Sequence, residues 1–236
     1  MPSIPLSPAL RVAQAVLDCC QVAILFLFSI LLLIAVSPAR AQDSNRFDYY
    51  VLALSWSPSY CAGEAGRNDR QQCFPGRRFA FVVHGLWPQR DDGWPEYCPT
   101  REDWIPQSVI EDIIDIMPSK SLIIHEWKKH GTCSGLSQRD YFRAVRQLFD
   151  KVRIPARYLS PRESVMVSPQ QLVTDFVKTN NGLTEDMLSV QCGNARDQAR
   201  LSELRVCVNK SGEFIACGSN ETRACRAETL VLLPVK

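Results

Sequence analysis

The chain has almost no excess of charge of either sign, because its 27 Lys and Arg residues nearly balance its 25 Asp and Glu residues. A net charge of +2 excludes a global basic field, so any site for a polyanion must be a local cluster. Internal repeats and low-complexity linkers are also absent. With 46% apolar and 22% charged residues, the 236-residue sequence is typical of a globular protein of one or at most two domains.

The chain has one long hydrophobic run, residues 22–36, and its fifteen residues are too few for an ordinary membrane span. That length is typical of the apolar segment of a signal peptide, and Ala39 and Ala41 form an A-x-A cleavage pattern after it. The sequence therefore predicts a signal peptide over 1–41 and a single domain over 42–236. The alternative is an uncleaved anchor. We expect a secreted or periplasmic monomer with no stable membrane association after cleavage.

Cysteine is plentiful but lacks the pattern of a zinc site. Two of the ten cysteines, Cys19 and Cys20, lie in the predicted signal peptide. No two of the remaining eight have the C-x-x-C spacing, which argues against structural zinc. An even number of cysteines in an exported chain predicts four disulfides. The eight are Cys61, Cys73, Cys98, Cys133, Cys192, Cys207, Cys217 and Cys225.

The apolar pattern places strands at both ends of the predicted domain and helices in its middle. Strands are predicted over 47–56, 78–84, 204–208, 213–217 and 230–235, with a loop over 64–78 and a hairpin turn over 209–212. Helices are predicted over 105–117, over 137–152 with Ser137 as N-cap, and from Ser168-Pro169 to near Asn181-Gly182. Strands without β-α-β alternation predict an α+β fold, an antiparallel β-sheet with helices packed beside it.

Histidine is scarce, and its distribution is informative. His84 lies in a Val-His-Gly-Leu-Trp-Pro segment, at the predicted end of a strand, and the other two lie in His-Glu-Trp-Lys-Lys-His-Gly. On a helix, His125, Glu126, Lys129 and His130 span an arc of roughly 140°, and Lys128 points away. The three histidines can therefore face each other across a cleft, which favours a functional site over a structural role.

These residue types favour phosphoryl chemistry. Imidazoles exchange protons near neutral pH, while a Lys and a protonated His suit a phosphoryl oxygen that gains charge. The sequence has neither a serine nucleophile elbow nor a Walker-type glycine loop. Cleavage of RNA by its own 2′-OH needs an acid, a base and cations, but no nucleophile from the protein.

Two segments, residues 84–88 and 125–133, closely resemble the active-site signatures of the ribonuclease T2 family, and residues 54–61 resemble the first strand of its bacterial members. The resemblance implies an α+β fold and a metal-independent endoribonuclease without a cofactor. It implies cleavage of single-stranded RNA to 2′,3′-cyclic phosphate ends with low base specificity, and no activity on DNA.

The resemblance also implies a role for each site residue. His84 matches the general acid and His130 the general base of the family. Glu126 and Lys129 match the pair that stabilises the five-coordinate phosphorane, and His125 matches the phosphate-binding histidine. Trp87 matches an aromatic residue of the base-binding site; its alternative is a core tryptophan that braces the strand.

The disulfide pairing is only partly indicated by the residues, since eight cysteines allow 105 pairings. The predicted hairpin places Cys207 and Cys217 on facing strands, and Cys61–Cys73 would close a local loop. The Cys98–Cys133 and Cys192–Cys225 bonds are implied by the family resemblance.

Three other functions fit parts of the sequence. A zinc hydrolase would use His125, Glu126 and His130, but its helix motif needs histidines four residues apart and these are five apart. A thiol hydrolase would use Cys133, in a Gly-Thr-Cys-Ser-Gly segment that mimics a nucleophile elbow. The third is a non-catalytic secreted RNA-binding or toxin-like protein on the same scaffold.

Overall fold

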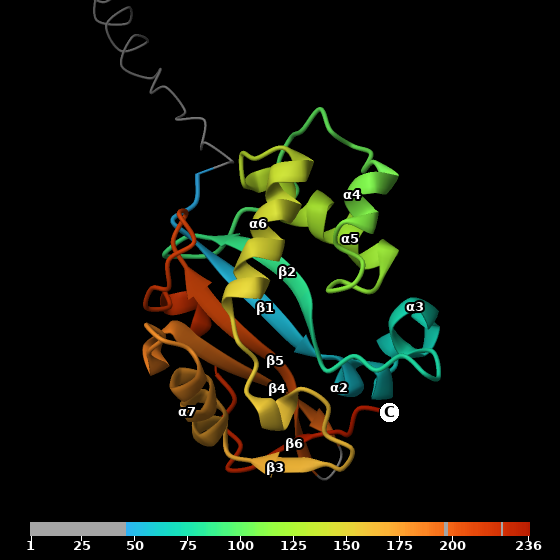
Figure 1. Ribbon diagram of the computed structural model, residues 1–236. Helices are drawn as coiled ribbons and strands as arrows, with labels where there is room; N and C mark the ends of the chain where they lie inside the picture. Colours follow the sequence, from blue (N-terminus) through green and yellow to red (C-terminus); the bar gives the residue numbers. More distant parts are fainter. Residues whose placement is uncertain (1–45, 196–197, 223) are drawn as a thin grey trace, which may run out of the picture. The chain divides into compact units, whose positions relative to one another are not determined.

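The computed structural model describes residues 46–195, 198–222 and 224–236. The predicted signal peptide, 1–41, lies outside them. Within the described residues, six strands form one sheet in the order β2-β1-β5-β6-β3, and β4 pairs with β5 (Figure 1). All pairings are antiparallel except the short parallel contact between β5 and β6. The strands are β1 (Tyr49–Trp56), β2 (Phe81–Gln89), β3 (Val165–Val167), β4 (Leu188–Ala195), β5 (Gln198–Val208) and β6 (Leu230–Leu232).

The helices pack beside this sheet, which confirms the α+β prediction. They are α2 (Ser57–Ala62), α3 (Arg70–Cys73), α4 (Gln107–Glu111), α5 (Lys120–Lys129), α6 (Gln138–Lys151) and α7 (Pro169–Thr179). Helix α6 contacts β1 and β2, α5 contacts β2, and α7 contacts β4 (Figure 1). None of the helices in the described part of the chain is long and apolar enough to cross a membrane.

The core follows from the two-residue period of β1. Tyr50, Leu52, Leu54 and Trp56 face the main core between the sheet and the helices. Tyr49, Val51 and Ala53 face the other side, where they form a smaller cluster that includes Trp87 and Cys207. Because both faces of β1 are covered, this strand is a rigid support for its neighbours β2 and β5.

Two helix starts are confirmed in detail. The Ser137 side chain accepts a hydrogen bond from the backbone N–H of Asp140, and the Ser168 side chain accepts one from that of Gln171. Each side chain satisfies a donor that the first turn of a helix leaves unpaired, and Pro169 follows as the first residue of α7.

Other boundaries differ from the sequence prediction. The helix expected over 105–117 is reduced to α4; residues 112–116 continue as hydrogen-bonded turns, with Met117 N–H bonded to the Ile113 carbonyl (2.9 Å), and the Ile116 carbonyl accepts a bond from the N–H of Val83 in β2 (2.9 Å). The predicted loop 64–78 contains the short helix α3, capped by Asp69. The predicted strand 213–217 makes only one bridge, Val208 to Phe214, although its turn forms.

Strand β2 is the difference that matters most for the site. It was expected to end at Gly85, but it continues through Pro88 to Gln89. Pro88 is tolerated because β2 is an edge strand of the sheet. The register with β1 shifts between Ala53, which faces Gly85, and Leu54, which faces Val83. His84 is thus the extra residue of a β-bulge in mid-strand, a feature that redirects side chains.

All four predicted disulfides are present: Cys61–Cys73, Cys98–Cys133, Cys192–Cys225 and Cys207–Cys217. Cys98–Cys133 joins the loop before α4 to the turn that follows α5, so it holds the end of α5 in place.

Candidate active site

The structure brings the predicted site residues together from β2 and α5. His84 Nε2 lies 3.7 Å from Glu126 Oε1, and the indole N–H of Trp87 donates to Glu126 Oε2 (2.7 Å). The Trp87 ring lies between two imidazoles, with ring centroids 5.1 Å from His84 and 5.4 Å from His130. Trp87 is 9% exposed, so it forms part of the buried floor of this cluster.

The close approach of α5 to β2 depends on Gly85. A methyl group at this position would overlap the Glu126 carboxylate and the indole nitrogen of Trp87. Next to it, the buried Tyr141 hydroxyl of α6 donates to the carbonyl of Leu86 (2.8 Å). These contacts fix β2 against the two helices that carry and support the site.

The end of α5 places the remaining residues. His130 follows the last helical residue, and its N–H donates to the Glu126 carbonyl (2.9 Å). Lys129 Nζ lies 3.8 Å from Glu96 Oε2, and its carbonyl accepts a hydrogen bond from the N–H of Tyr97 (2.8 Å). His125 and Lys128 are exposed on the same helix.

The two imidazoles next to Trp87, half-exposed His84 and buried His130, have opposite electrostatic surroundings. For His84, burial opposes protonation, but the hydrogen bond and charge of Glu203 and the charge of Glu126 outweigh it, so its pKa is raised. For His130, burial and the neighbouring charges of Lys129, His84 and His125 all act in one direction and lower the pKa to about 3. These surroundings therefore favour the protonated form of His84 and the neutral form of His130.

The other two titratable groups are shifted by burial as well. Burial raises the pKa of Glu126 to about 7, against the opposing charge of His84 and the hydrogen bond from Trp87. Burial, followed by the charges of Lys129 and His84, lowers the pKa of His125. Ionisable groups that lie close together and have shifted pKa values are a mark of acid–base sites.

Sequence reasoning missed two residues of the cluster, Glu203 and Arg205. Glu203 Oε1 lies 2.5 Å from His84 Nδ1, and Arg205 stacks over the Trp87 ring (4.9 Å). They come from β5, more than a hundred positions from His84. The signal available in the sequence was Arg205 inside the predicted strand 204–208 and Glu203 directly before it, two charged side chains that a continued strand would place on one face.

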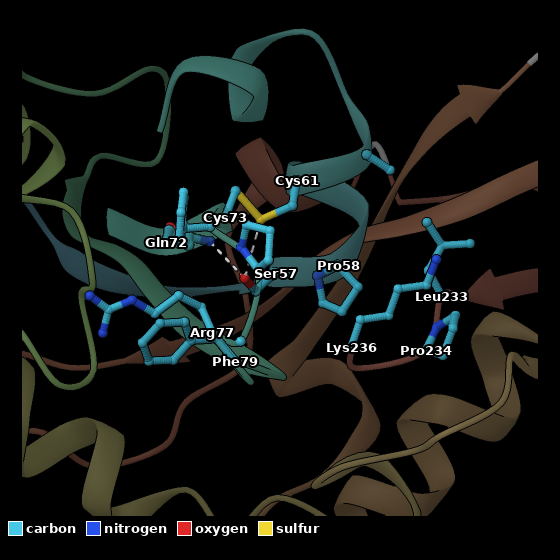
Figure 2. Close-up of a pocket in the computed structure, with 14 residues that line it drawn as sticks. Ser57, Pro58, Cys61, Gln72, Cys73, Arg77, Phe79, Leu233, Pro234 and Lys236 are labelled. Carbon is cyan, nitrogen blue, oxygen red and sulfur yellow. Dashed lines mark hydrogen bonds between the residues drawn. A yellow bond between two sulfur atoms is a disulfide. The ribbon is translucent and has the colours of Figure 1, made fainter. Parts of the chain in front are cut away.

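A cavity of about 410 Å³ opens beside His84, and its wall includes Ser55, Tyr60, Arg200 and Glu203. A second cavity, of about 450 Å³, is lined by the Cys61–Cys73 disulfide, Phe79, Arg77 and the C-terminal residues (Figure 2). There the Gln72 amide donates to the Ser57 hydroxyl (3.0 Å), and none of the predicted catalytic residues lines the wall. Of the predicted catalytic residues, His84 lines the first cavity, and His125, Glu126, Lys129 and His130 line neither of the two.

Two of the alternative functions conflict with the structure. Cys133 is bonded to Cys98 and is not a free thiol, so it is not a nucleophile. In the part of the chain that the structure describes, no three or more His, Cys, Asp and Glu residues are grouped as a metal site, so His125, Glu126 and His130 do not form the zinc triad.

A bulged strand and a helix end bring two imidazoles with oppositely shifted pKa values together with a carboxylate and a lysine on a disulfide-bonded α+β scaffold, an arrangement suited to acid–base chemistry. The profile of the ribonuclease T2 family matches residues 47–217. The chain belongs to that family and is a metal-independent endoribonuclease.

Individual relatives agree with this assignment. The chain is 46% identical over 190 residues to a ribonuclease of Aeromonas hydrophila, covering 76% of this chain and 80% of that protein. It is 30% identical over 184 residues to a probable ribonuclease of Haemophilus influenzae, covering 73% of this chain and 61% of the relative. The crystal structure of RNase NT in complex with 5′-AMP superposes with a TM-score of 0.60 at 26% identity, covering 78% of this chain and 97% of the other.

Proposed function

We propose that this ribonuclease cleaves single-stranded RNA by transphosphorylation, with His130 as general base and His84 as general acid. The observation that carries the proposal is the pair of imidazoles that both contact Trp87, one whose protonation is favoured by carboxylates and one whose protonation is opposed by burial and positive charges. Environments that separate the pKa values of two groups assign acid and base roles to them.

In the first step, the imidazole of His130 takes the proton of the ribose 2′-OH, and the 2′ oxygen forms a bond to phosphorus. The bond from phosphorus to the 5′ oxygen breaks, and His84 gives its proton to that oxygen. The product has a 2′,3′-cyclic phosphate. Water then opens the ring with the two roles reversed, so the enzyme returns to its starting protonation state.

Three residues hold the phosphate during these steps. Lys129 and His125 supply positive charge toward its oxygens. Glu126, whose pKa is raised to about 7, can hydrogen-bond a phosphoryl oxygen in its protonated form, and Trp87 fixes its carboxyl group. In this proposal Lys129, His125 and Glu126 contact the transferred phosphoryl group, and Trp87 acts through Glu126.

Base recognition remains a prediction. Trp87 contacts His84, Glu126 and Arg205 and is largely buried, which supports bracing of the site more than stacking on a base. Trp94 and Tyr97 are exposed on the loop that bonds to Lys129. Stacking on such rings tolerates every base, which supports low base specificity.

We also propose that residues 1–41 direct export and are removed after Ala41, leaving a secreted or periplasmic monomer without a membrane anchor. Four disulfides support an oxidising compartment. The intact mass of the exported protein tests this: we expect a chain that begins at Gln42, and a chain that retains Leu31 would contradict the cleavage.

Substitution of the two imidazoles tests the catalytic assignment. His84→Ala and His130→Ala should each lose about 10²–10⁴-fold in the rate of RNA cleavage, the range for general acid–base groups. Lys128→Ala is the matched control on the same helix end and should retain nearly full activity, since Lys128 is exposed and the mechanism does not use it. Full activity of either histidine variant would contradict the proposal.

A further inference from the structure

Behind His84 lies a carboxylate that the proposed chemistry does not use. Glu203 on β5 reaches across β1 to His84 Nδ1 at 2.5 Å, and its side chain is 13% exposed. The β-bulge in β2 brings the imidazole there, because His84 is the residue without a partner in the register with β1. With Nδ1 held by Glu203, the free ring nitrogen is Nε2, which faces Glu126 at 3.7 Å.

Glu203 is itself held by other charges. Arg205 Nε donates to Glu203 Oε2 (2.9 Å), and its Nη1 donates to Glu221 Oε2 (3.1 Å). Glu203 and Arg205 are two residues apart on one strand and so share a face. Glu221 lies in the short turn Ser219–Glu221, and its side chain is 2% exposed. His84, Glu203, Arg205 and Glu221 thus form one line of alternating charges, which we call the charge row.

The sum of charges along this row depends on His84. With a protonated imidazole, two positive and two negative groups balance. With a neutral imidazole, a net negative charge remains, and it is only partly screened by water because the Glu203 and Glu221 side chains are 13% and 2% exposed. The row therefore favours the protonated imidazole.

His130 has no equivalent arrangement. Its Nδ1 is buried and lacks a hydrogen-bond partner among the described residues. The two catalytic imidazoles share Trp87 between them but differ in what supports them from behind. This asymmetry supplies a structural reason why one acts as acid and the other as base.

We propose that Glu203, held by Arg205 and Glu221, is a positioning residue that orients His84 and keeps it protonated for delivery of a proton to the leaving 5′ oxygen. The inference rests on the proposed function, because it assumes His84 to be the general acid. Glu203 acts through His84 and does not touch the reacting atoms. The titratable and charged groups that face His84 are Glu203 and Arg205 from β5, His125 and Glu126 from α5, and His130 after it.

The test compares Glu203→Gln with the wild-type enzyme on two substrates. A uridylyl-adenosine dinucleotide needs a proton on its leaving oxygen, whereas the 4-nitrophenyl ester of uridine 3′-phosphate releases a stable anion and needs none. For the dinucleotide, we expect the alkaline limb of kcat/KM against pH to move down by about one to three pH units, because the charge that favours protonated His84 is removed. At pH values above the shifted limb, kcat/KM should fall at least about tenfold.

Under the same conditions Glu203→Gln should cleave the aryl ester at nearly the wild-type rate. For the dinucleotide, the acid limb of kcat/KM, which reports the pKa of His130, should stay in place. Glu203→Asp, which keeps the charge, should restore part of the alkaline limb. Glu213→Gln is the matched control, since the carboxylate of this exposed glutamate pairs with Lys151, away from the charge row, and its loss should leave both limbs unchanged. Equal loss on both substrates, or an unmoved alkaline limb, would overturn the inference.

A direct titration keeps the inference testable if Glu203→Gln does not fold. The chain has three histidines, so NMR can follow each imidazole of the wild-type protein. We expect His84 to be the last of the three to lose its proton as pH rises; loss at a pH below either of the others would overturn the inference. A wild-type enzyme inactive on both substrates would instead contradict the proposed function, and this inference with it.

Discussion

His84 and His130 are the same side chain in two surroundings, and the difference between them determines the expected pH dependence. Activity on RNA requires neutral His130 and protonated His84. As pH falls, His130 gains a proton and activity is lost; as pH rises, His84 loses its proton and activity is lost again. Because the pKa of His130 is lowered and that of His84 is raised, both forms coexist over a wide range that includes mildly acidic pH.

We therefore expect a bell-shaped profile of kcat/KM with its centre near or below neutrality. A bound phosphate adds negative charge beside His130 and raises its pKa, so the acid limb of kcat should lie at higher pH than the acid limb of kcat/KM. Steady-state kinetics across the pH range measures both. A profile that rises steadily into the alkaline range would contradict the assignment of His84 as the acid.

Gly85 offers a second prediction at the residue scale. Gly85→Ala would push a methyl group into the Glu126 carboxylate and the Trp87 indole, so α5 must move away from β2. We expect a loss of about 1–3 kcal/mol of unfolding free energy, as for other overpacked sites, and a large drop in kcat. Urea denaturation and RNA cleavage measure the two effects.

Gly193→Ala is the control for stability, because the added methyl group meets no atom within 4 Å and the residue does not have a positive φ. It should leave the denaturation midpoint unchanged. If Gly85→Ala also left both stability and activity unchanged, Glu126 would not be held as tightly as the contacts indicate.

Site residues that lie within a recognisable sequence motif could be predicted from the sequence. Site residues that a distant strand contributes could not. His84, Glu126 and His130 were found because two short segments concentrate the scarce histidines. Glu203 was not, because its contact with His84 joins positions 119 residues apart and depends on the pairing of β5 with β1.

At the scale of elements, N-cap residues predicted the helix boundaries better than apolar periodicity did. Ser137 and Ser168 begin α6 and α7 as expected, since a cap is a local hydrogen bond. The apolar period over 105–117 correctly predicted burial of Ile113 and Met117 but also predicted a continuous helix, whereas residues 112–116 form turns that bury the same face. Similarly, Gly85 and Pro88 did not end β2, because the tertiary contacts of an edge strand tolerate both.

The end of α5 is the element whose placement matters most for activity, and the Cys98–Cys133 disulfide secures it. Replacing both cysteines by Ala should cost about 2–5 kcal/mol of stability. It should also lower kcat, because the bond holds Tyr97 against Lys129 and the turn after His130. Thermal denaturation and RNA cleavage below the melting temperature measure the two effects.

The matched comparison is Cys61→Ala with Cys73→Ala. This bond closes a loop with a sequence separation of 12 rather than 35 and borders the cavity away from the catalytic cluster. It should cost stability but leave kcat of the folded enzyme nearly unchanged. An equal effect of the two disulfides on kcat would show that Cys98–Cys133 has no special part in holding the site.

At the scale of the whole molecule, the sheet and the disulfides hold two imidazoles, a lysine and a carboxylate in one cluster without a nucleophile from the protein. Because the net charge is only +2, the attraction for the phosphate has to come from local groups such as Lys129. The attacking group must then come from the substrate itself. DNA should be inert, because it lacks the 2′-OH.

Phosphorus NMR of the products from a short RNA, in the presence of a chelator, tests this central claim most directly. The matched substrate is the same oligonucleotide with a single 2′-deoxy nucleotide at the cleaved position. We predict that a 2′,3′-cyclic phosphate forms first from the RNA and then opens more slowly, that the chelator has no effect, and that the 2′-deoxy bond stays intact. Cleavage of the 2′-deoxy bond, or a 3′-phosphate formed without a cyclic precursor, would contradict the account.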